Sequence, residues 1–248
     1  MQPIVLITGG SRGIGAATAR RAARAGFHVA VNYRRNDVAA RAVVESVHDA
    51  GGKAIAVAGD IARESDVVRI FETVDHELGR LAALVNNVGI LETQARVDSI
   101  DAAWLTRILT TNVTGAFLCA REAIRRMSTR HGGQGGAIVN VSPAAARLGA
   151  AGEYVDYAAS KGVMDSMTIG LSQEVAAEGI RVNAVRPAFI HTDMHTSDGE
   201  PARVDRIKDA LPMKRGGTPA EVANAILWLM SDEASYTTGT FMEMAGGK

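Results

Sequence analysis

The pentapeptide from Tyr157 to Lys161 places a phenol and an ammonium group at positions i and i+4. On a helix, residues with this spacing share one face. A phenol has a reference pKa of about 10, and a neighbouring cation favours the phenolate and lowers that pKa. A tyrosine tuned in this way can exchange a proton with an alcohol oxygen. The alternative is a surface tyrosine and lysine one turn apart, so the rest of the chain has to decide between the two.

A glycine-rich loop follows the first apolar run of the chain. Ile4 to Ile7 is short and rich in β-branched residues, which is typical of a strand buried on both faces of a parallel sheet. The loop Thr8 to Gly15 comes next, and a helical pattern runs from Ala16 to Ala25. A strand, a glycine loop and a helix in this order bring backbone N–H groups and a helix N-terminus to a phosphate. The spacing is G-x-x-x-G-x-G, and its β-loop-α context favours a dinucleotide site over an ordinary turn.

The end of the second predicted strand favours NADP(H) as the dinucleotide. A site for NAD usually has an acidic residue near this point, where it binds the ribose 2′-hydroxyl. Here the strand ends in Asn32-Tyr33-Arg34-Arg35, and Arg12 lies in the glycine loop. Guanidinium groups in place of a carboxylate favour a 2′-phosphate, and hence NADP(H), while NAD(H) remains possible. The alternative is that these arginines are only solvated.

Strands and helices alternate along the whole chain. Further strands are predicted at 54–58, 81–85, 137–141, 180–185 and 240–245. This alternation predicts an α/β fold, a single Rossmann-like domain over 1–248 in which a doubly wound parallel sheet of about seven strands has helices on both faces. Residues 188–217 interrupt the rhythm and are predicted to form a lid over the substrate. Ligands bind beyond the carboxyl ends of such strands, where Asp60 and Asn87 fall.

Two polar features allow more than one interpretation. Asn112 lies among apolar residues of a long helical region, 105–130, and needs hydrogen-bond partners if it is buried. It is either a structural asparagine or part of a polar site. His191 and His195 stand four apart with Asp193 between them, but no third ligand has a suggestive spacing. A polar lid or a substrate contact is therefore favoured, and no metal is predicted.

The bulk composition excludes several classes of protein. The chain has 248 residues, of which 47% are hydrophobic, and its 27 basic residues balance 27 acidic ones. Such a chain is globular and gives no sign of a nucleic-acid or membrane-surface partner. No apolar run is long enough to span a membrane, and the N-terminus lacks the features of a signal peptide. With Cys119 as its only cysteine, the protein is expected to be cytoplasmic.

Together these motifs resemble the classical short-chain dehydrogenase/reductase family over essentially the whole chain. The residues that carry the resemblance are, in order, the glycine loop 9–15, Asp60, Asn86-Asn87-Val88-Gly89, Asn112, Tyr157-x-x-x-Lys161, Pro187 and Thr192. The resemblance implies an enzyme that moves a hydride between a nicotinamide cofactor and an alcohol or carbonyl carbon. The cofactor carries the hydride chemistry, while the protein orients and polarises the reactants.

The resemblance also implies a role for each matching residue. Tyr157 would be the general acid/base, and Lys161 would bind the nicotinamide ribose and lower the Tyr157 pKa. Asn112 would hold a water in a proton relay, and Asp60 would accept a hydrogen bond from the adenine amino group. The other cofactor-binding positions would be Gly9, Ser11, Arg12, Gly13, Ile14, Gly15, Asn32, Arg34, Ile61, Asn87, Gly89, Pro187, Ile190 and Thr192.

The sequence departs from the family pattern most clearly after the fifth strand. Family members often have Ser-Ser there, and the second, catalytic serine usually lies thirteen residues before the tyrosine. Here the pair is Ser142-Pro143, and the thirteenth residue before Tyr157 is Ala144. One extra residue in the loop 150–156 would put Pro143, which has no hydroxyl, in the serine's place. Ser142 would then substitute imperfectly, or the enzyme would be weakened, since loss of one oxyanion-type donor commonly costs about 10²–10³ in kcat.

Two smaller departures add bulk where the backbone usually passes close to the cofactor. Val88 stands in place of an alanine, and Ala188 stands in place of a glycine. The resemblance further implies a homotetramer, in which the helices over 105–130 and 157–179 pair across one two-fold axis and the last helix and strand pair across another.

Two functional hypotheses from different classes follow. The first is an NADP-preferring oxidoreductase for a small ketone, aldehyde, sugar or alcohol, similar to the glucose-dehydrogenase-like and 3-oxoacyl-reductase-like members of the family. The second is a dinucleotide-binding protein with little catalysis because of Pro143. A phosphate-binding NTPase is excluded because the glycine loop lacks the Lys-Ser/Thr ending that grips phosphates and Mg²⁺.

Overall fold

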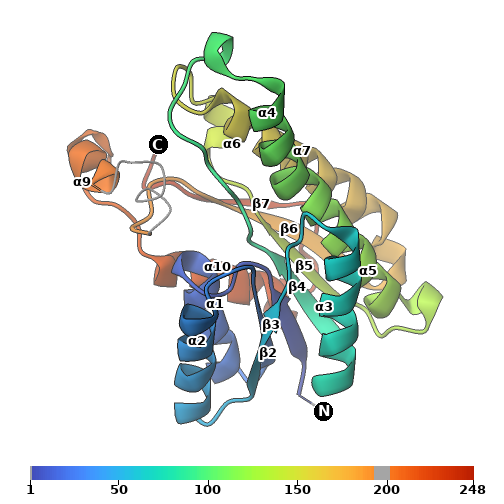
Figure 1. Cartoon of the computed structure of the whole chain (residues 1–248). Helices are drawn as coiled ribbons and strands as arrows, with labels where there is room; N and C mark the ends of the chain where they lie inside the picture. Colours follow the sequence, from blue (N-terminus) through green and yellow to red (C-terminus); the bar gives the residue numbers. More distant parts are fainter. Residues whose placement is uncertain (1, 193–201) are drawn as a thin grey trace.

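Seven parallel strands form the frame of the molecule in the computed structural model, which describes residues 2–192 and 202–248 (Figure 1). The strand order is β3-β2-β1-β4-β5-β6-β7, and every neighbouring pair is parallel. This sheet confirms the predicted fold class. The strands are β1 (Ile4–Ile7), β2 (His28–Tyr33), β3 (Ala54–Ala58), β4 (Leu81–Asn86), β5 (Gly136–Val141), β6 (Ile180–Pro187) and β7 (Phe241–Met244).

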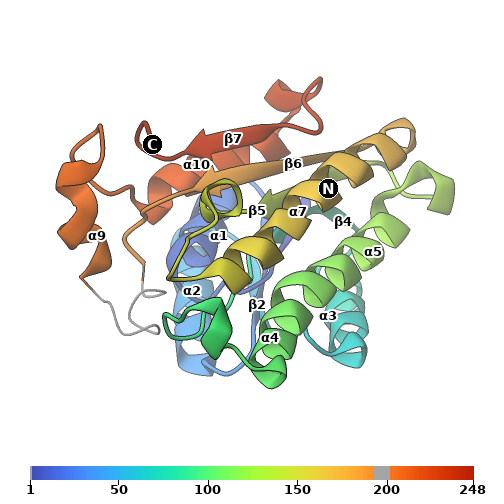
Figure 2. The same cartoon turned by 90° about the horizontal axis from the view of Figure 1, so that it is seen from above.

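Helices cover both faces of the sheet, as Figure 2 shows. The central strands are apolar on both sides because each side packs against a helical layer; all four residues of β1 are buried. One core lies on the side of the first helix and the other on the side of Phe71 and Cys119. The first layer consists of α1 (Gly13–Arg24), α2 (Asp37–Asp49) and α10 (Pro219–Met230), and the second of α3 (Glu64–Glu77), α5 (Gly115–Met127) and α7 (Val155–Glu174).

The topology reverses direction beside β1, which lies between β2 and β4. The chain first builds outward through β2 to β3 and then returns to the other side of β1 to form β4. At such a switch point the loops leaving the carboxyl ends of the two central strands diverge and open a crevice. The glycine loop leaves β1 and the Asn87 loop leaves β4 at this point, so the fold brings both motifs to one place.

The long helical region predicted at 105–130 is interrupted by a wider turn. Helix α4 (Ala102–Leu109) runs into a π-helical turn (Thr110–Thr114) and then into α5. Such turns insert an extra residue and are frequent at functional sites. The turn contains Asn112, and it is followed by Gly115, where a β-carbon would lie 2.9 Å from the Ile61 carbonyl oxygen. Close approach of this helix to the end of β3 therefore requires glycine.

The segment 188–217 is described at both of its flanks. Ile190 pairs with Gly217 in an isolated parallel bridge, and a short helix α9 (Arg203–Ile207) follows the gap. The predicted contacts of Asp193 and His195 lie outside the described residues. Across the part of the chain that the structure describes, no helix is both long and apolar enough to cross a lipid bilayer. The cytoplasmic location stays a prediction.

A buried carboxylate joins α3 to α5. Glu122 is 4% exposed and accepts hydrogen bonds from Arg121, Arg125 and Arg126, and Arg126 also pairs with Asp75 of α3 at 2.7 Å. Burial alone would raise the Glu122 pKa, but the hydrogen bonds from Arg126 and Arg121 outweigh it and the net shift is downward. The ionised carboxylate is therefore the form that the folded protein stabilises.

We predict that Glu122→Gln lowers the free energy of unfolding by about 3 kcal/mol at pH 7, because it removes the buried charge that three guanidinium groups share and leaves Arg121 and Arg126 each with a single, more exposed carboxylate. The matched control is Glu64→Gln, whose carboxylate pairs with Arg121 but is 62% exposed, so the cost is at most about 1 kcal/mol. Urea denaturation of the two variants and the parent measures both effects.

The same experiment repeated on acidification tests the sign of the pKa shift. A lowered folded-state pKa gives a stabilisation that is complete above the ordinary carboxyl pKa, near 4.5, and is lost as the pH falls through the lower folded-state value. The difference between parent and Glu122→Gln should therefore be constant from pH 7 to 5 and shrink below about pH 4.5. A difference that grows on acidification would contradict the argument.

Candidate active site

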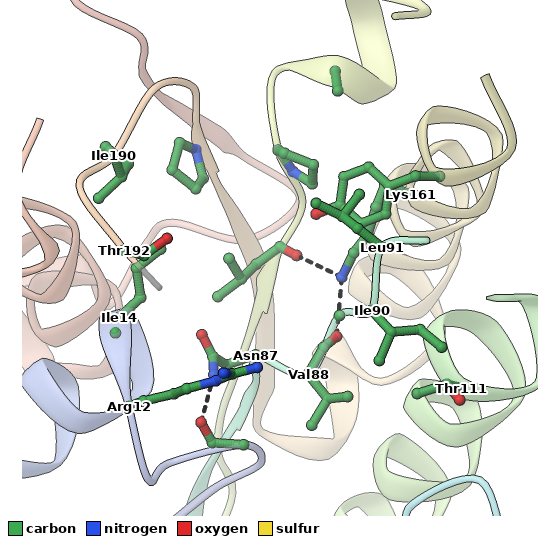
Figure 3. A pocket seen from close by; sticks show the side chains of 18 of the residues that line it. Arg12, Ile14, Asn87, Val88, Ile90, Leu91, Thr111, Lys161, Ile190 and Thr192 are labelled. Atoms are coloured by element: carbon green, nitrogen blue, oxygen red, sulfur yellow. Dashed lines mark hydrogen bonds between the residues drawn. The ribbon is translucent and has the colours of Figure 1, made fainter. Parts of the chain in front are cut away.

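A single cavity of about 800 Å³ connects the glycine loop to the Tyr157 helix at the carboxyl ends of the strands. Its volume lies within the usual range for small-molecule and cofactor sites. In Figure 3, Arg12, Asn87 and Thr192 lie toward one end of the cavity, and Lys161, Leu91 and Thr111 toward the other. The cavity is therefore long enough to join a nucleotide-sized half to a smaller half beside Tyr157.

The predicted cofactor-binding residues converge on this cavity, with the exception of Gly15. The structure does not bring the predicted Asn112 and Ser142 to its surface. The predicted residues that line the cavity are Gly9, Ser11, Arg12, Gly13, Ile14, Asn32, Arg34, Asp60, Ile61, Asn87, Gly89, Tyr157, Lys161, Pro187, Ile190 and Thr192.

The glycine loop has the shape of a phosphate cradle. Gly9 and Gly13 have positive φ angles of 62° and 53°, which suit glycine. Gly15 is behind the cavity wall, where a β-carbon would lie 2.5 Å from the Gly9 carbonyl oxygen. Helix α1 begins at Gly13 without a side-chain cap and without an acidic residue in its first turn. Its uncapped N–H groups and positive dipole end suit a negatively charged ligand.

Asn87 braces the glycine loop from the side of β4. Its side-chain amide donates to the carbonyl oxygens of Thr8 at 2.9 Å and of Gly9 at 3.2 Å, and its backbone N–H donates to the Thr8 hydroxyl at 3.0 Å. The neighbouring Val88 also packs against the loop, since its Cγ2 lies 3.0 Å from where a β-carbon on Gly9 would be. The Asn87 side chain thus shapes the glycine loop in addition to lining the cavity.

Asn32 has a similar bracing function at the end of β2. It is 2% exposed, and its amide group donates to the carbonyl oxygens of Val57 at 3.2 Å and Gly59 at 3.1 Å. Its side-chain oxygen accepts from the backbone N–H of Gly9 at 3.4 Å. The predicted contact with a cofactor stays a prediction, because the hydrogen bonds shown join β2, β3 and the glycine loop.

The arginines at the nucleotide end differ in their partners. Arg34 forms an ion pair with Asp60, with 2.8 Å between its Nε and the Asp60 Oδ2. Asp60 also accepts from the backbone N–H of Ala62 at 3.0 Å, so its carboxylate is already engaged. Arg12 and Arg35 line the same end of the cavity, and neither forms an ion pair within residues 2–192 and 202–248. These two guanidinium groups are the ones left to meet a phosphate.

Tyr157 and Lys161 lie one turn apart on α7, at the other end of the cavity. Lys161 is 1% exposed, and its ammonium group donates to the carbonyl oxygens of Val88 at 3.1 Å and Val141 at 3.2 Å (Figure 3). Gly89 leaves room for it, since a β-carbon there would lie 3.2 Å from the Lys161 Nζ. Within the described residues the Tyr157 hydroxyl has no hydrogen-bond partner, although it lies on the cavity wall.

Burial dominates the protonation of this pair. Burial lowers the pKa of Lys161 to about 8 and raises the pKa of Tyr157 above its ordinary value. The net shift for the chain by itself is therefore upward, opposite to the lowering expected from Lys161, and the effect of Lys161 on the phenol stays a prediction. The ammonium lies 6.0 Å from the centre of the phenol ring, and it does not offset the loss of solvent around the phenolate. At neutral pH Tyr157 holds its proton.

Asn112 lies one residue away from the cavity surface, which Thr111 reaches instead. It is 1% exposed; its side-chain oxygen accepts from the backbone N–H of Ile90 at 2.8 Å, and its amide donates to the Ile90 carbonyl oxygen and the Ser160 hydroxyl, each at 3.1 Å. Asn112 therefore fastens the loop after β4 to α7. Its predicted proton-relay role stays a prediction.

Ser142 faces away from the cavity, which contradicts its predicted contact with a substrate oxygen. It is fully buried, and its hydroxyl donates to the Asp165 carboxylate at 2.7 Å and to the Lys161 carbonyl oxygen at 3.1 Å. Pro143 lines the cavity in its place. Successive side chains leave an extended strand on opposite sides, so Val141 and Pro143 face the cavity and Ser142 faces α7.

Several further lining residues had no motif to reveal them. They lie beside Tyr157 on the loop after β4, on the short helix α6 (Ala145–Leu148) and on the described flanks of 188–217. Their side chains are mostly apolar, and their positions depend on loop shapes that the sequence does not encode by spacing. They include Ile90, Leu91, Ala144, Leu148, Tyr154, Phe189 and Arg203.

Comparison with known proteins decides the family. The profile of a family described as "Enoyl-(Acyl carrier protein) reductase" matches residues 9–248. The chain belongs to the short-chain dehydrogenase/reductase family. As a member of that family it is an oxidoreductase that uses a nicotinamide cofactor.

Individual relatives of this short-chain dehydrogenase/reductase cover nearly all of the chain. It is 59% identical to "Uncharacterized oxidoreductase YgfF" of Escherichia coli over 99% of each sequence. It is 32% identical to the 3-oxoacyl-[acyl-carrier-protein] reductase FabG of Staphylococcus epidermidis, over 100% of this chain and 99% of that one. A crystal structure of 3-ketoacyl-(acyl-carrier-protein) reductase from Brucella melitensis, complexed with NADH, superposes with a TM-score of 0.91 at 32% identity, covering 99% of this chain and 97% of that one.

Proposed function

We propose that the chain is an NADP(H)-dependent oxidoreductase that interconverts a small alcohol and its ketone or aldehyde, with Tyr157 as the general acid/base. The observation that carries this proposal is the position of the Tyr157 hydroxyl. It lies on the cavity wall, without a hydrogen-bond partner among the described residues, one helical turn from the buried Lys161. A proton donor so placed is available to a ligand oxygen.

The residues at the other end of the cavity fit a dinucleotide. The uncapped N-terminus of α1 and the glycine loop would hold the pyrophosphate, and Arg12 and Arg35 would meet a 2′-phosphate. When bound, the nicotinamide ring supplies or accepts the hydride. Val88 and Ala188 line the cavity as well, and neither closes the path between the two ends.

The protein's own groups would orient the reactants and move one proton. An ammonium group has three N–H donors, and Lys161 gives two of them to backbone carbonyls. The third is left for a ribose hydroxyl. The raised pKa of Tyr157 keeps its phenol protonated at neutral pH, so the free enzyme is poised to donate a proton to a carbonyl oxygen. The resting protonation state therefore favours reduction of the carbonyl.

The described parts of 188–217 support its assignment to the substrate side. Phe189 and Arg203 line the cavity from the two flanks of this segment. Tyr154 and Leu148 complete a mostly apolar wall around the end of the cavity that holds Tyr157. A small carbonyl compound with an apolar body is what this surface would accept.

A second candidate function is binding of a dinucleotide with little or no catalysis. It is favoured by Pro143, which lines the cavity without a hydroxyl group, and by the orientation of Ser142 toward Asp165. The two candidates differ in one measurement. Tight NADPH binding without oxidation by any member of a panel of ketones, aldehydes and diketones would favour the second.

We predict that Tyr157→Phe reduces kcat for NADPH-dependent carbonyl reduction by about 10²–10⁴-fold, because it removes the proton donor and little else. NADPH binding, followed by its fluorescence, should stay within a factor of a few. Tyr236→Phe is the matched control, since that side chain is fully exposed. Equal turnover of Tyr157→Phe and the parent would remove Tyr157 from the mechanism.

We predict that Arg12→Ala weakens NADPH binding by about 10–100-fold and leaves NADH binding within about threefold, because a charge-assisted contact to phosphate is lost. Titration of both cofactors measures the two constants. Arg24→Ala, at the opposite and exposed end of α1, should change neither. A parallel loss for NADH and NADPH would show that Arg12 shapes the loop and does not select the cofactor.

We also propose a homotetramer. Large apolar side chains are exposed along the outer surface of α4, α5 and α7, which lie side by side in Figure 2, and again on α10. They are Leu105, Leu109, Phe117, Ile169 and Trp228, each between 37% and 47% exposed. Exposed apolar groups of this kind commonly mark interfaces.

Sedimentation velocity tests the assembly. The expected species has four times the chain mass of 26.1 kDa. Phe117→Asp should shift it to smaller species, because it places a charge in the interface, whereas Val38→Asp, on an exposed site of α2, should not. A monomer at micromolar concentration would contradict the proposal.

A further inference from the structure

Between Val141 and Ala150, no side chain that lines the cavity beside the catalytic pair carries a hydrogen-bond donor. This wall is built from the end of β5, from α6 and from the start of the loop that follows α6. It adjoins the pair directly, because the Val141 carbonyl oxygen accepts from the Lys161 ammonium at 3.2 Å. The side chains that it presents to the cavity are Val141, Pro143, Ala144, Ala145, Leu148 and Ala150.

The backbone of this wall offers no replacement near Pro143. Proline has no N–H group. The N–H of Ala144 is already donated to the Pro187 carbonyl oxygen at 3.0 Å, and the N–H of Ser142 to the Val185 carbonyl oxygen at 3.0 Å. Residues 142–144 therefore offer no second hydrogen bond to a carbonyl oxygen on the Tyr157 hydroxyl.

The Ser142 hydroxyl is not available to turn inward. It belongs to a chain of polar contacts in which Asp165 pairs with Arg186 at 2.7 Å and Arg186 pairs with Glu243 at 2.9 Å. The Arg186 guanidinium also lies 3.9 Å from the centre of the Phe241 ring. Reorienting Ser142 would leave a largely buried Asp165 short of one donor, which costs about 1–3 kcal/mol.

The absence of a donor at Pro143 affects how well the site stabilises negative charge on the carbonyl oxygen. Reduction adds a hydride to the carbonyl carbon and the Tyr157 proton to the carbonyl oxygen, and negative charge gathers on that oxygen as the hydride arrives. Each preorganised donor aimed at such an oxygen is worth about 10²–10³ in kcat. An electron-withdrawing neighbour in the substrate stabilises the same charge from within and reduces the need for the donor.

We infer that this site selects activated carbonyl compounds, such as vicinal diketones and 2-oxo esters, over simple ketones. The inference rests on the proposed function, since it assumes that Tyr157 protonates the substrate. It assigns Pro143 as a residue that determines this selectivity: position 143 supplies no donor beside the Tyr157 hydroxyl, and an activated substrate supplies part of that stabilisation itself.

The test uses pentane-2,3-dione and pentan-2-one, which have the same carbon chain, with NADPH and the full-length protein. Pro143→Ser adds a hydroxyl to the wall, and Pro143→Ala is the matched variant, because it gains the same backbone N–H as the serine variant but no hydroxyl. We expect Pro143→Ser to raise kcat for pentan-2-one by about 10²-fold and for pentane-2,3-dione by less than about tenfold. Pro143→Ala should raise neither, and Ser142→Ala should leave the ratio of the two substrates unchanged.

The outcomes separate this inference from the proposed function. An equal gain for both ketones in Pro143→Ser, no gain with NADPH binding intact, or a parent enzyme that reduces pentan-2-one as fast as the dione would each overturn the inference while leaving the reductase standing. Absence of NADPH oxidation by either ketone, in the parent and in Pro143→Ser alike, would overturn the proposed function itself.

Discussion

The burial of the Lys161 ammonium group is the constraint around which the active site is arranged. A buried cation is costly unless its protons are satisfied, and here two backbone carbonyls satisfy two of them. Those carbonyls belong to Val88, in the loop after β4, and to Val141, at the end of β5. One side chain thus joins two strand ends to the helix that carries Tyr157, and Gly89 is small because a larger residue would press on this lysine.

Other polar side chains around the cavity also join separate segments of the chain through hydrogen bonds. Asn32, Asn87 and Asn112 each use their amide groups to tie loops or strands to one another. A ligand site at a topological switch point is built from loops, which lack the regular backbone hydrogen bonds that hold helices and strands in place. Amide side chains supply the missing hydrogen bonds, and for that reason residues of this type gather at the strand ends.

The fold and much of the lining of the cavity were predictable from the sequence because their signals are local. Apolar β-branched runs such as Ile4–Ile7 and the glycine spacing 9–15 fix strand, turn and helix within a few residues. The orientation of Ser142 was not predictable by the same means, because it depends on Asp165, which lies 23 residues away. The direction of the Tyr157 pKa shift was not predictable either, since it depends on burial and not on the neighbouring charge alone.

Substitution of Pro143 has a consequence for evolution that substitution of Ser142 does not have. Every proline codon becomes a serine codon by a change of its first base, so a hydroxyl at this site is one mutation away. The side chain at 143 faces the cavity, whereas the side chain of Ser142 forms the buried hydrogen bonds that join the end of β5 to α7. A lineage can therefore gain or lose that hydroxyl without repacking its core, and substrate range can drift faster here than the scaffold does.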